Sequence, residues 1–217
     1  MENKHQVHNL IILDESGSME GIKNTIIQGF NELVQTIQGI EQQFPDQEHL
    51  ISFVSFNGLG HKTIHFKEPA VSLKQLDMTS YMPNASTPLF DAMGFAINTL
   101  KQSLQEQSAY NVLVTILTDG EENASKEFSG AAIKQLVDEL KLERWTFTYI
   151  GTDHDVEKIA LTLSINNTLV FERNEEDIKR MFDREKISRE HYSRRIQSSE
   201  DTSSGYYTDS EDEKKDK

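Results

Sequence analysis

Hydrophobic positions along this chain follow two spacings. Six short runs, rich in Ile, Leu, Val, Phe and Thr and ended by polar or Gly-containing segments, are typical of β-strands. They cover residues 7–13, 49–56, 63–66, 112–117, 145–150 and 168–171. Elsewhere hydrophobic residues recur every three or four positions, which predicts amphipathic helices with one buried face. These helices are expected over residues 22–39, 89–100, 128–142, 156–163 and 175–188.

The order of these elements predicts the class of fold. Strands that alternate with helices indicate βαβ units, and therefore a doubly wound α/β fold with a mainly parallel sheet and helices on both faces. The run at residues 112–117 is almost continuously apolar, as in a strand covered on both sides. The turn sequence Asn57-Gly58-Leu59-Gly60 predicts a hairpin, so residues 63–66 should form one antiparallel edge strand.

The end of the chain differs in composition. Residues 198–217 are rich in Ser, Thr, Asp, Glu and Lys, and Tyr206 and Tyr207 are their only large apolar groups. Such a segment buries too little surface to offset the entropy of ordering it. We therefore predict one folded domain over residues 1–190 and an acidic, disordered tail over residues 191–217.

Charge and composition exclude several classes of function. The formal net charge is −14, which disfavours direct binding to nucleic acid or to anionic membranes. The absence of cysteine excludes disulfides and zinc–thiolate sites. The polar N-terminus lacks the apolar core of a signal peptide, and no apolar stretch approaches the roughly 20 residues that span a bilayer. A cytoplasmic location is the default expectation.

Candidate chemistry lies in three loops. Asp14, Ser16 and Ser18 follow the first strand, Asp119 follows the strand at residues 112–117, and Thr87 lies in an irregular loop before a helix. Ligands of open α/β sheets bind beyond the carboxyl ends of the strands. Carboxylate and hydroxyl oxygens there are the hard ligands that Mg²⁺ or Mn²⁺ prefers. We therefore predict a metal site formed by these five residues.

Each piece of this pattern also has a simpler interpretation. Asp14 and Ser16 could cap the following helix. The sequence Thr118-Asp119-Gly120 is common in turns, and Thr87 before a proline is common at helix starts. The metal site is favoured because all three loops are predicted at one edge of the sheet.

Other polar residues near these loops are given structural interpretations. We expect solvated carboxylates at Glu15, Glu121 and Glu122, and a first-turn helix acid at Asp91. Asp153 and Asp155 are expected to cap a helix, with a secondary ligand role as the alternative. His61 and His65 are expected to face solvent on the edge strand.

The five positions together resemble the von Willebrand factor A domain, whose metal-ion-dependent adhesion site combines Asp-x-Ser-x-Ser with a distant Thr and a distant Asp. The segments Thr-Pro-Leu-Phe-Asp-Ala-Met and Leu-Thr-Asp-Gly-Glu-Glu-Asn resemble the intracellular bacterial branch of that family. The resemblance runs from Val7 to the last helix. It implies a Rossmann-like fold and a protein partner that supplies an Asp or Glu carboxylate to the metal. An AAA+ ATPase, in a stress-response system or another assembly, is one partner that it implies.

The resemblance also implies a role for each residue. Ser16 and Ser18 would contact the ion directly, Thr87 directly or through water, and Asp14 and Asp119 mostly through metal-bound water. A non-enzymatic, metal-dependent interaction module is therefore the favoured function. The alternative is a Mg²⁺-dependent phosphatase-like hydrolase, but Ser16 stands where such an enzyme has a second acid, and a hydroxyl is no general acid at neutral pH.

Overall fold

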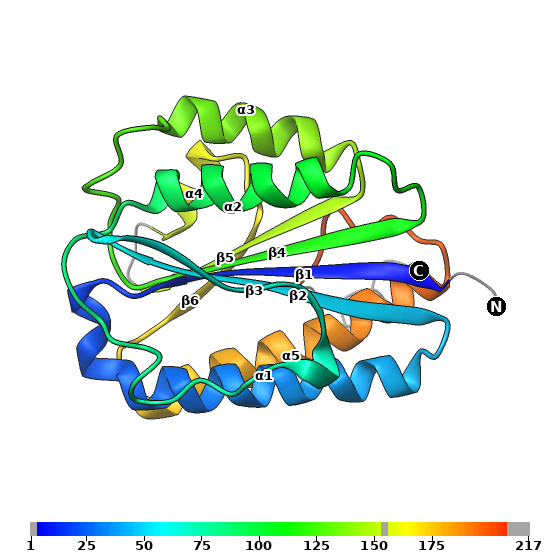
Figure 1. The fold of residues 1–217 in the computed structure, drawn as a ribbon, viewed down its shortest axis with the longest axis horizontal. Coiled ribbons are helices and arrows are strands. Elements are labelled where there is room, and N and C mark those ends of the chain that lie inside the picture. The colour runs from blue at the N-terminus through cyan, green and yellow to red at the C-terminus, as the bar shows by residue number, and fades with distance from the viewer. Residues whose placement is uncertain (1–3, 153–155, 208–217) are drawn as a thin grey trace, which may run out of the picture.

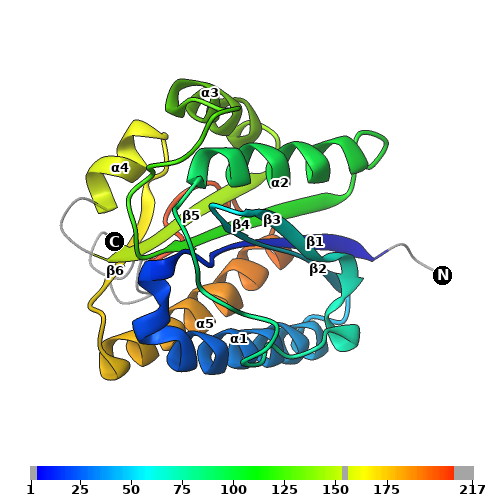
Figure 2. The same ribbon diagram turned by 60° about the vertical axis from the view of Figure 1, so that its left-hand side comes forward.

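A six-stranded sheet lies between two layers of helices (Figures 1 and 2). The computed structural model describes residues 4–152 and 156–207. The strands are β1 (His5–Asp14), β2 (Gln47–Asn57), β3 (Gly60–Pro69), β4 (Tyr110–Thr118), β5 (Trp145–Thr152) and β6 (Asn167–Phe171). The α-helices are α1 (Lys23–Gln43), α2 (Leu89–Ser103), α3 (Gly130–Lys141), α4 (Val156–Thr162) and α5 (Glu175–Gln197), and two 3₁₀ helices are η1 (Gly17–Ile22) and η2 (Ala70–Ser72).

The sheet has the order β3-β2-β1-β4-β5-β6. All neighbouring strands are parallel except the hairpin of β2 and β3, which confirms the predicted fold class and its antiparallel edge. The chain leaves β1 toward β2 on one side, and later returns to β4 on the other side of β1. The order therefore reverses between β1 and β4, and parallel sheets bind ligands beyond the strand ends at such a point.

Two apolar layers hold the sheet between its helices. Leu10 and Ile12 of β1 pack toward α2, α3 and α4, whereas Ile11 and Leu13 pack toward α1 and α5. This alternation follows from the period of two in a strand. Residues 112–118 of β4 are all buried, which confirms the prediction that this strand is covered on both faces. Within the described residues, none of the helices is both long and apolar enough to cross a membrane.

The last helix and the segment after it differ from the prediction. Residues 191–197 continue α5, so the boundary predicted after residue 190 falls inside this helix. Residues 198–207 then pack against the sheet: Tyr206 is only 3% exposed, and Thr146 and Asn111 bond to Thr202. The remaining part of the predicted tail, residues 208–217, lies outside the described residues. Polar contacts and the apolar packing of Tyr206 with Val7, Leu113 and Tyr192 together hold residues 198–207 in place.

A buried ion pair anchors α5 to the sheet. Arg189 contacts Glu185 at 3.0 Å, and both side chains are at most 2% exposed. Arg189 also donates hydrogen bonds to Asn9 of β1 at 2.7 Å and to Thr115 of β4 at 2.6 Å. The hydroxyls of Tyr206 and Tyr207 donate to the two oxygens of Glu185 at 3.0 and 2.8 Å. The segment after α5 therefore completes the hydrogen bonding of a buried carboxylate, which would otherwise be costly to bury.

Two buried histidines predict that the protein loses stability in mild acid. Burial, followed by nearby positive charge, lowers the pKa of His8 to about 4 and that of His49 to about 3. The unfolded chain therefore takes up protons below pH 6.5 that the folded chain refuses, so stability present above pH 6.5 is lost as the pH falls. Each histidine should lower the free energy of unfolding by about 2 kcal/mol between pH 7 and pH 5. Urea unfolding at both pH values should show a fall that is about 2 kcal/mol smaller in His49→Gln. An equal fall in both proteins would contradict this prediction.

Candidate metal centre

The predicted ligands lie on three segments at one edge of the sheet. Asp14 is the last residue of β1, and Ser16 and Ser18 follow it at the start of η1. Asp119 comes directly after β4, the neighbour of β1, and Thr87 lies just before α2. The strand order places the first two segments at the point where the sheet topology reverses. The loop before α2 closes over them.

Hydrogen bonds connect four of the five residues. The carboxylate of Asp14 accepts from the backbone N–H of Ser16 at 2.7 Å. The hydroxyls of Ser16 and Ser18 lie 3.1 Å apart. Ser18 in turn donates to Oδ1 of Asp119 at 2.6 Å. Carboxylates and hydroxyls from the ends of two neighbouring strands therefore form one contiguous group.

Gly120 shows that the remaining residue, Thr87, faces the same space. A methyl group placed on Gly120 would lie 3.2 Å from Oγ1 of Thr87, 3.5 Å from Oγ of Ser18 and 3.9 Å from Oδ2 of Asp14. One point beside this glycine, which follows Asp119 on the third segment, is thus close to oxygens from the other two segments. The glycine leaves that space free of side-chain atoms. The donor set fits a small, hard cation, because every converging atom is a carboxylate or hydroxyl oxygen.

Most of the candidate ligands are buried, so negative charge at the centre is costly without a cation. Asp14, Ser16, Thr87 and Asp119 are each at most 4% exposed. Burial raises the pKa of Asp14 to about 6, against hydrogen bonds from Thr118 and Ser16, and the charge of Asp119 adds to the rise. The negative charge of Asp119 therefore disfavours the ionised form of Asp14, and two buried carboxylates beside one space favour a cation between them.

One oxygen of Asp119 is left without a hydrogen bond. Its Oδ2 atom is buried and accepts none within the described part of the chain. The guanidinium of Arg173, which lies between β6 and α5, is 3.5 Å from this oxygen and also donates to the backbone carbonyl of Asp119. Buried carboxylate oxygens are usually hydrogen-bonded, so this atom is a ligand candidate.

Acidic and histidine side chains alone do not make a metal site here. Among residues 4–152 and 156–207, no group of three or more His, Cys, Asp or Glu is placed to hold an ion. The candidate centre therefore depends on its three hydroxyls as well as its two carboxylates. This is the donor set that the sequence predicts.

A comparison with known families identifies the domain. The sequence model of the von Willebrand factor type A domain matches residues 10–184 of this chain. The chain belongs to the von Willebrand factor type A (VWA) family. VWA domains are generally protein-interaction modules rather than enzymes. No curated protein sequence matches the chain.

Solved structures share this VWA fold at low sequence identity. The vWF domain of the type V pili tip protein Mfa5 from Porphyromonas gingivalis matches with a TM-score of 0.58 and 10% identity, over 85% of this chain and 96% of that one. The SpRpn10 VWA domain matches with a TM-score of 0.52 and 8% identity, over 84% and 94%. Proximal thread matrix protein 1 from the mussel byssus matches with a TM-score of 0.54 and 10% identity, over 83% of this chain but only 44% of that protein. At these identities the likeness shows the fold alone.

The helix-capping interpretation receives mixed support in this VWA domain. Ser16 precedes η1, but its hydroxyl makes no capping hydrogen bond. The Ser16 N–H donates to the carboxylate of Asp14, which is a local turn contact and does not cap η1. Pro88 directly precedes α2, so Thr87 lies at a helix start, as the alternative for this residue proposes. These residues can therefore have local roles beside a helix start and still face one common space.

Glu15 is the most important residue that the sequence interpretation placed wrongly. It is fully buried rather than solvated, and it accepts hydrogen bonds from Ser55 at 2.8 Å, Lys62 at 3.1 Å and the backbone of Met82 at 2.6 Å. These donors come from β2, β3 and the loop before α2. Glu15 therefore fixes the metal-site loop to three other segments, and nothing in the local sequence around it signals these contacts.

Several of the other acids organise the loop that follows β4. Glu122 is half-buried rather than solvated, since it accepts from the backbone of Phe90 at 2.9 Å and of Ser125 at 2.7 Å. Asp91 lies in the first turn of α2 as predicted, and Glu121 is exposed as predicted. Asp153 and Asp155 lie outside the described residues.

The two histidines of the edge strand behave differently from each other. His65 is buried, contrary to the prediction, and lies 3.0 Å from Glu68. His61 is exposed as predicted, and its ring stacks on Phe95 of α2 with 3.7 Å between ring centroids. A bulge in the pairing of β2 and β3 accounts for the departure from simple alternation, because it shifts the register beside Phe53.

Proposed function

We propose that this VWA domain binds Mg²⁺, or Mn²⁺, through Asp14, Ser16, Ser18, Thr87 and Asp119, and that the bound ion accepts an Asp or Glu carboxylate of a protein partner. The observation that supports this most directly is the space beside Gly120, the residue after Asp119, because oxygens of Asp14, Ser18 and Thr87 lie close to it. With Ser16, Ser18 and Thr87 as its direct ligands and the two aspartates acting through water, the ion would have no negatively charged direct ligand from this chain and would be short of negative charge. An external carboxylate would supply it.

The chemistry of the ion would be recognition rather than turnover. When bound, it would act as a Lewis acid toward an anionic group of the partner. The chain's own residues would fix its position: Asp14 and Asp119 are buried and cannot move away, and Ser18 is held by Asp119 at 2.6 Å. The hydrolase alternative is less favoured, because the buried hydroxyl of Ser16 stands where a phosphatase needs its acid or base.

The kind of partner is a proposal as well. Among the structural neighbours, Mfa5 is a pili tip protein, and SpaC is a pilus adhesin, a name that describes adhesive binding. Binding of a protein surface is therefore the activity that we carry over to this chain. The resemblance to the intracellular bacterial branch leads us to propose an AAA+ ATPase as a partner, in the cytoplasm.

Calorimetric titration of Mg²⁺ into chelator-stripped protein tests the metal site. Saturable binding at one site is expected, weakened at least about tenfold in Ser18→Ala because one ligand is removed. Ser108→Ala is the matched control, since Ser108 is exposed and precedes the start of β4, whereas Asp119 follows its end. No saturable binding by the wild type, or equal affinity in Ser18→Ala, would refute the proposal.

The position of the ion can be tested separately with Mn²⁺. Substoichiometric Mn²⁺ should broaden the amide NMR signals of Ser16, Ser18 and Gly120. It should spare those of Asn111 and Lys141, which lie at the opposite edge of the sheet. Broadening centred elsewhere would place the ion at a different site.

A further inference from the structure

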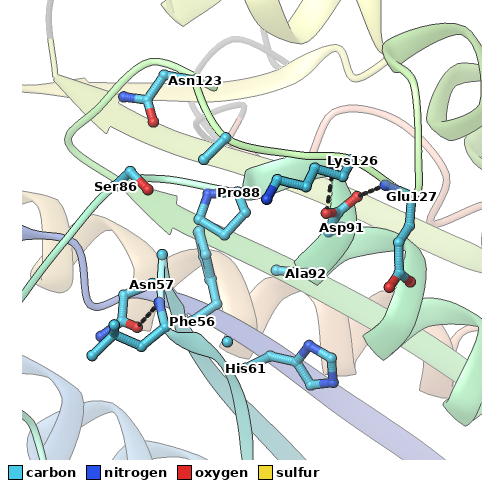
Figure 3. A pocket seen from close by; sticks show the side chains of 14 residues that line it. Phe56, Asn57, His61, Ser86, Pro88, Asp91, Ala92, Asn123, Lys126 and Glu127 are labelled. Atoms are coloured by element: carbon cyan, nitrogen blue, oxygen red, sulfur yellow. Dashed lines mark hydrogen bonds between the residues drawn. The ribbon is translucent and has the colours of Figure 1, made fainter.

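A cavity of about 570 Å³ opens beside the candidate metal centre (Figure 3). Three segments line it: the turn between β2 and β3, the segment before α2, and the loop after β4. Ser86 and Pro88 belong to its wall and flank Thr87, a candidate ligand, so the pocket and the metal centre share one stretch of backbone. Asn123 secures this shared wall, because its side chain accepts from the Thr87 N–H at 2.9 Å and its own N–H donates to the Thr87 carbonyl at 3.2 Å.

One carboxylate of the pocket wall, that of Asp91, already accepts hydrogen bonds from the backbone. Asp91 accepts the backbone N–H groups of Lys126, Glu127 and Phe128 at 2.8 to 2.9 Å. Burial works against its ionisation, but these donors hold the pKa of Asp91 below its usual value. Asp91 is thus an ionised group whose oxygens serve to fold the loop over the pocket, and it has little capacity left for a ligand.

The polar groups with unused capacity are donors. Lys126 forms no ion pair within the described part of the chain, and Figure 3 shows its ammonium reaching toward Pro88 at the shared wall. Asn57 and Asn123 each use the side-chain oxygen to accept a backbone N–H, from Leu59 and Thr87, both at 2.9 Å. Among the residues that the structure describes, the NH₂ groups of these two side chains donate no hydrogen bond.

The hydroxyl of Ser86 adds a further polar group at the same wall, on an exposed residue. Glu127 is the one other acid of the pocket, and its carboxylate points away from Lys126 in Figure 3. A ligand beside Lys126 would thus meet a cation and several N–H or O–H donors. That environment suits a carboxylate.

We propose that this pocket binds a second acidic side chain of the same partner segment whose first acidic side chain coordinates the metal. The inference rests on the proposed function. Lys126 would pair with the second carboxylate, and Asn57, Ser86 and Asn123 would donate hydrogen bonds to it. Because the chain carries a net charge of −14, the bound ion, Arg173 beside Asp119, and Lys126 would supply positive charges that let an acidic segment approach. The partner motif would therefore contain two acids rather than one.

Blocked peptides with defined acids test this proposal on the full chain. Each probe carries two glutamates separated by one, two or three glycines, and matched probes have either glutamate replaced by glutamine. In saturating Mg²⁺, one spacing should bind about tenfold more tightly than its glutamine counterparts, since a charge-assisted pair contributes about 1.5 kcal/mol or more. Amide NMR shifts should then appear at Gly58, Gly60 and Lys126 as well as at Ser18 and Gly120.

Two lysine variants decide whether the pocket is responsible. Lys126→Met should remove the tenfold gain and leave the affinity for single-glutamate peptides unchanged. Lys74→Met is the matched control, because Lys74 is an exposed lysine on the loop that packs against α1, across the sheet from α2. It should retain the gain.

The outcomes separate the two proposals. If single-glutamate peptides bind only with Mg²⁺, but no two-glutamate peptide binds better, the pocket proposal is wrong and the proposed function stands. The same conclusion follows if the gain survives in Lys126→Met. If no peptide binds in a Mg²⁺-dependent way, the proposed function fails and the pocket proposal fails with it.

Discussion

The Asp14→Asn variant is expected to lose Mg²⁺ binding while resisting urea at least as well as the wild type. Asp14 is fully buried, and no lysine or arginine among the described residues forms an ion pair with it. A buried carboxylate without a cation costs folding free energy that a neutral amide of the same shape does not. We expect the variant to be more stable by up to about 2 kcal/mol in the absence of metal.

This prediction separates a ligand from a structural cap. Asn caps a helix about as well as Asp, so a residue that only caps should show little change in Asp14→Asn, whereas a ligand should lose its ion. Calorimetry with Mg²⁺ and urea unfolding in EDTA measure the two quantities. Asp46→Asn is the control, since Asp46 is an exposed turn residue whose side chain forms no hydrogen bond or ion pair within the described part of the chain. Unchanged Mg²⁺ affinity in Asp14→Asn, or a clear loss of stability, would speak against the assignment.

The second large effect concerns the buried ion pair of α5. Arg189→Met is expected to lower the free energy of unfolding by about 3 to 5 kcal/mol, because it leaves the buried carboxylate of Glu185 without its cation. It also removes the guanidinium N–H groups that donate to Asn9 and Thr115, which lie on two strands of the sheet. Urea unfolding at pH 7 measures the loss.

The same helix supplies the control for this substitution. Arg194 pairs with Glu190 at 3.1 Å four residues apart, but its side chain is 58% exposed. Arg194→Met should cost less than about 0.5 kcal/mol, since solvent screens exposed pairs of this kind. Similar losses of unfolding free energy in the two variants would show that burial of the Arg189–Glu185 pair adds nothing to its effect on stability.

The sequence predicts elements whose burial is apolar, and it fails where burial is polar. The apolar run of β4 is visible as a buried strand, and the structure confirms it. The second half of α5 is not visible, because the residues that it buries there include Ser188, Arg189 and Ser193. A periodicity of hydrophobic residues cannot report a helix face whose contacts are ion pairs and hydrogen bonds.

The candidate site shows a similar division. Its five residues could be proposed from the sequence because each follows a strand or precedes a helix, and parallel strands bring such positions to one edge. The supporting contacts of Glu15 could not be proposed, because Ser55 and Lys62 reach it only through the pairing of β2 with β1 and β3. The pocket with Lys126 depends in turn on how the loop after β4 folds back onto Asp91.

The packed segment after α5 determines how this protein can be shortened. A fragment ending at residue 190, where composition suggests a boundary, would lack Tyr192, Tyr206 and Tyr207 and would leave Glu185 without two of its hydrogen-bond donors. Such a fragment would report on a damaged scaffold, and a failure to bind Mg²⁺ would say little about the metal centre. Expressed fragments should therefore extend at least to residue 207.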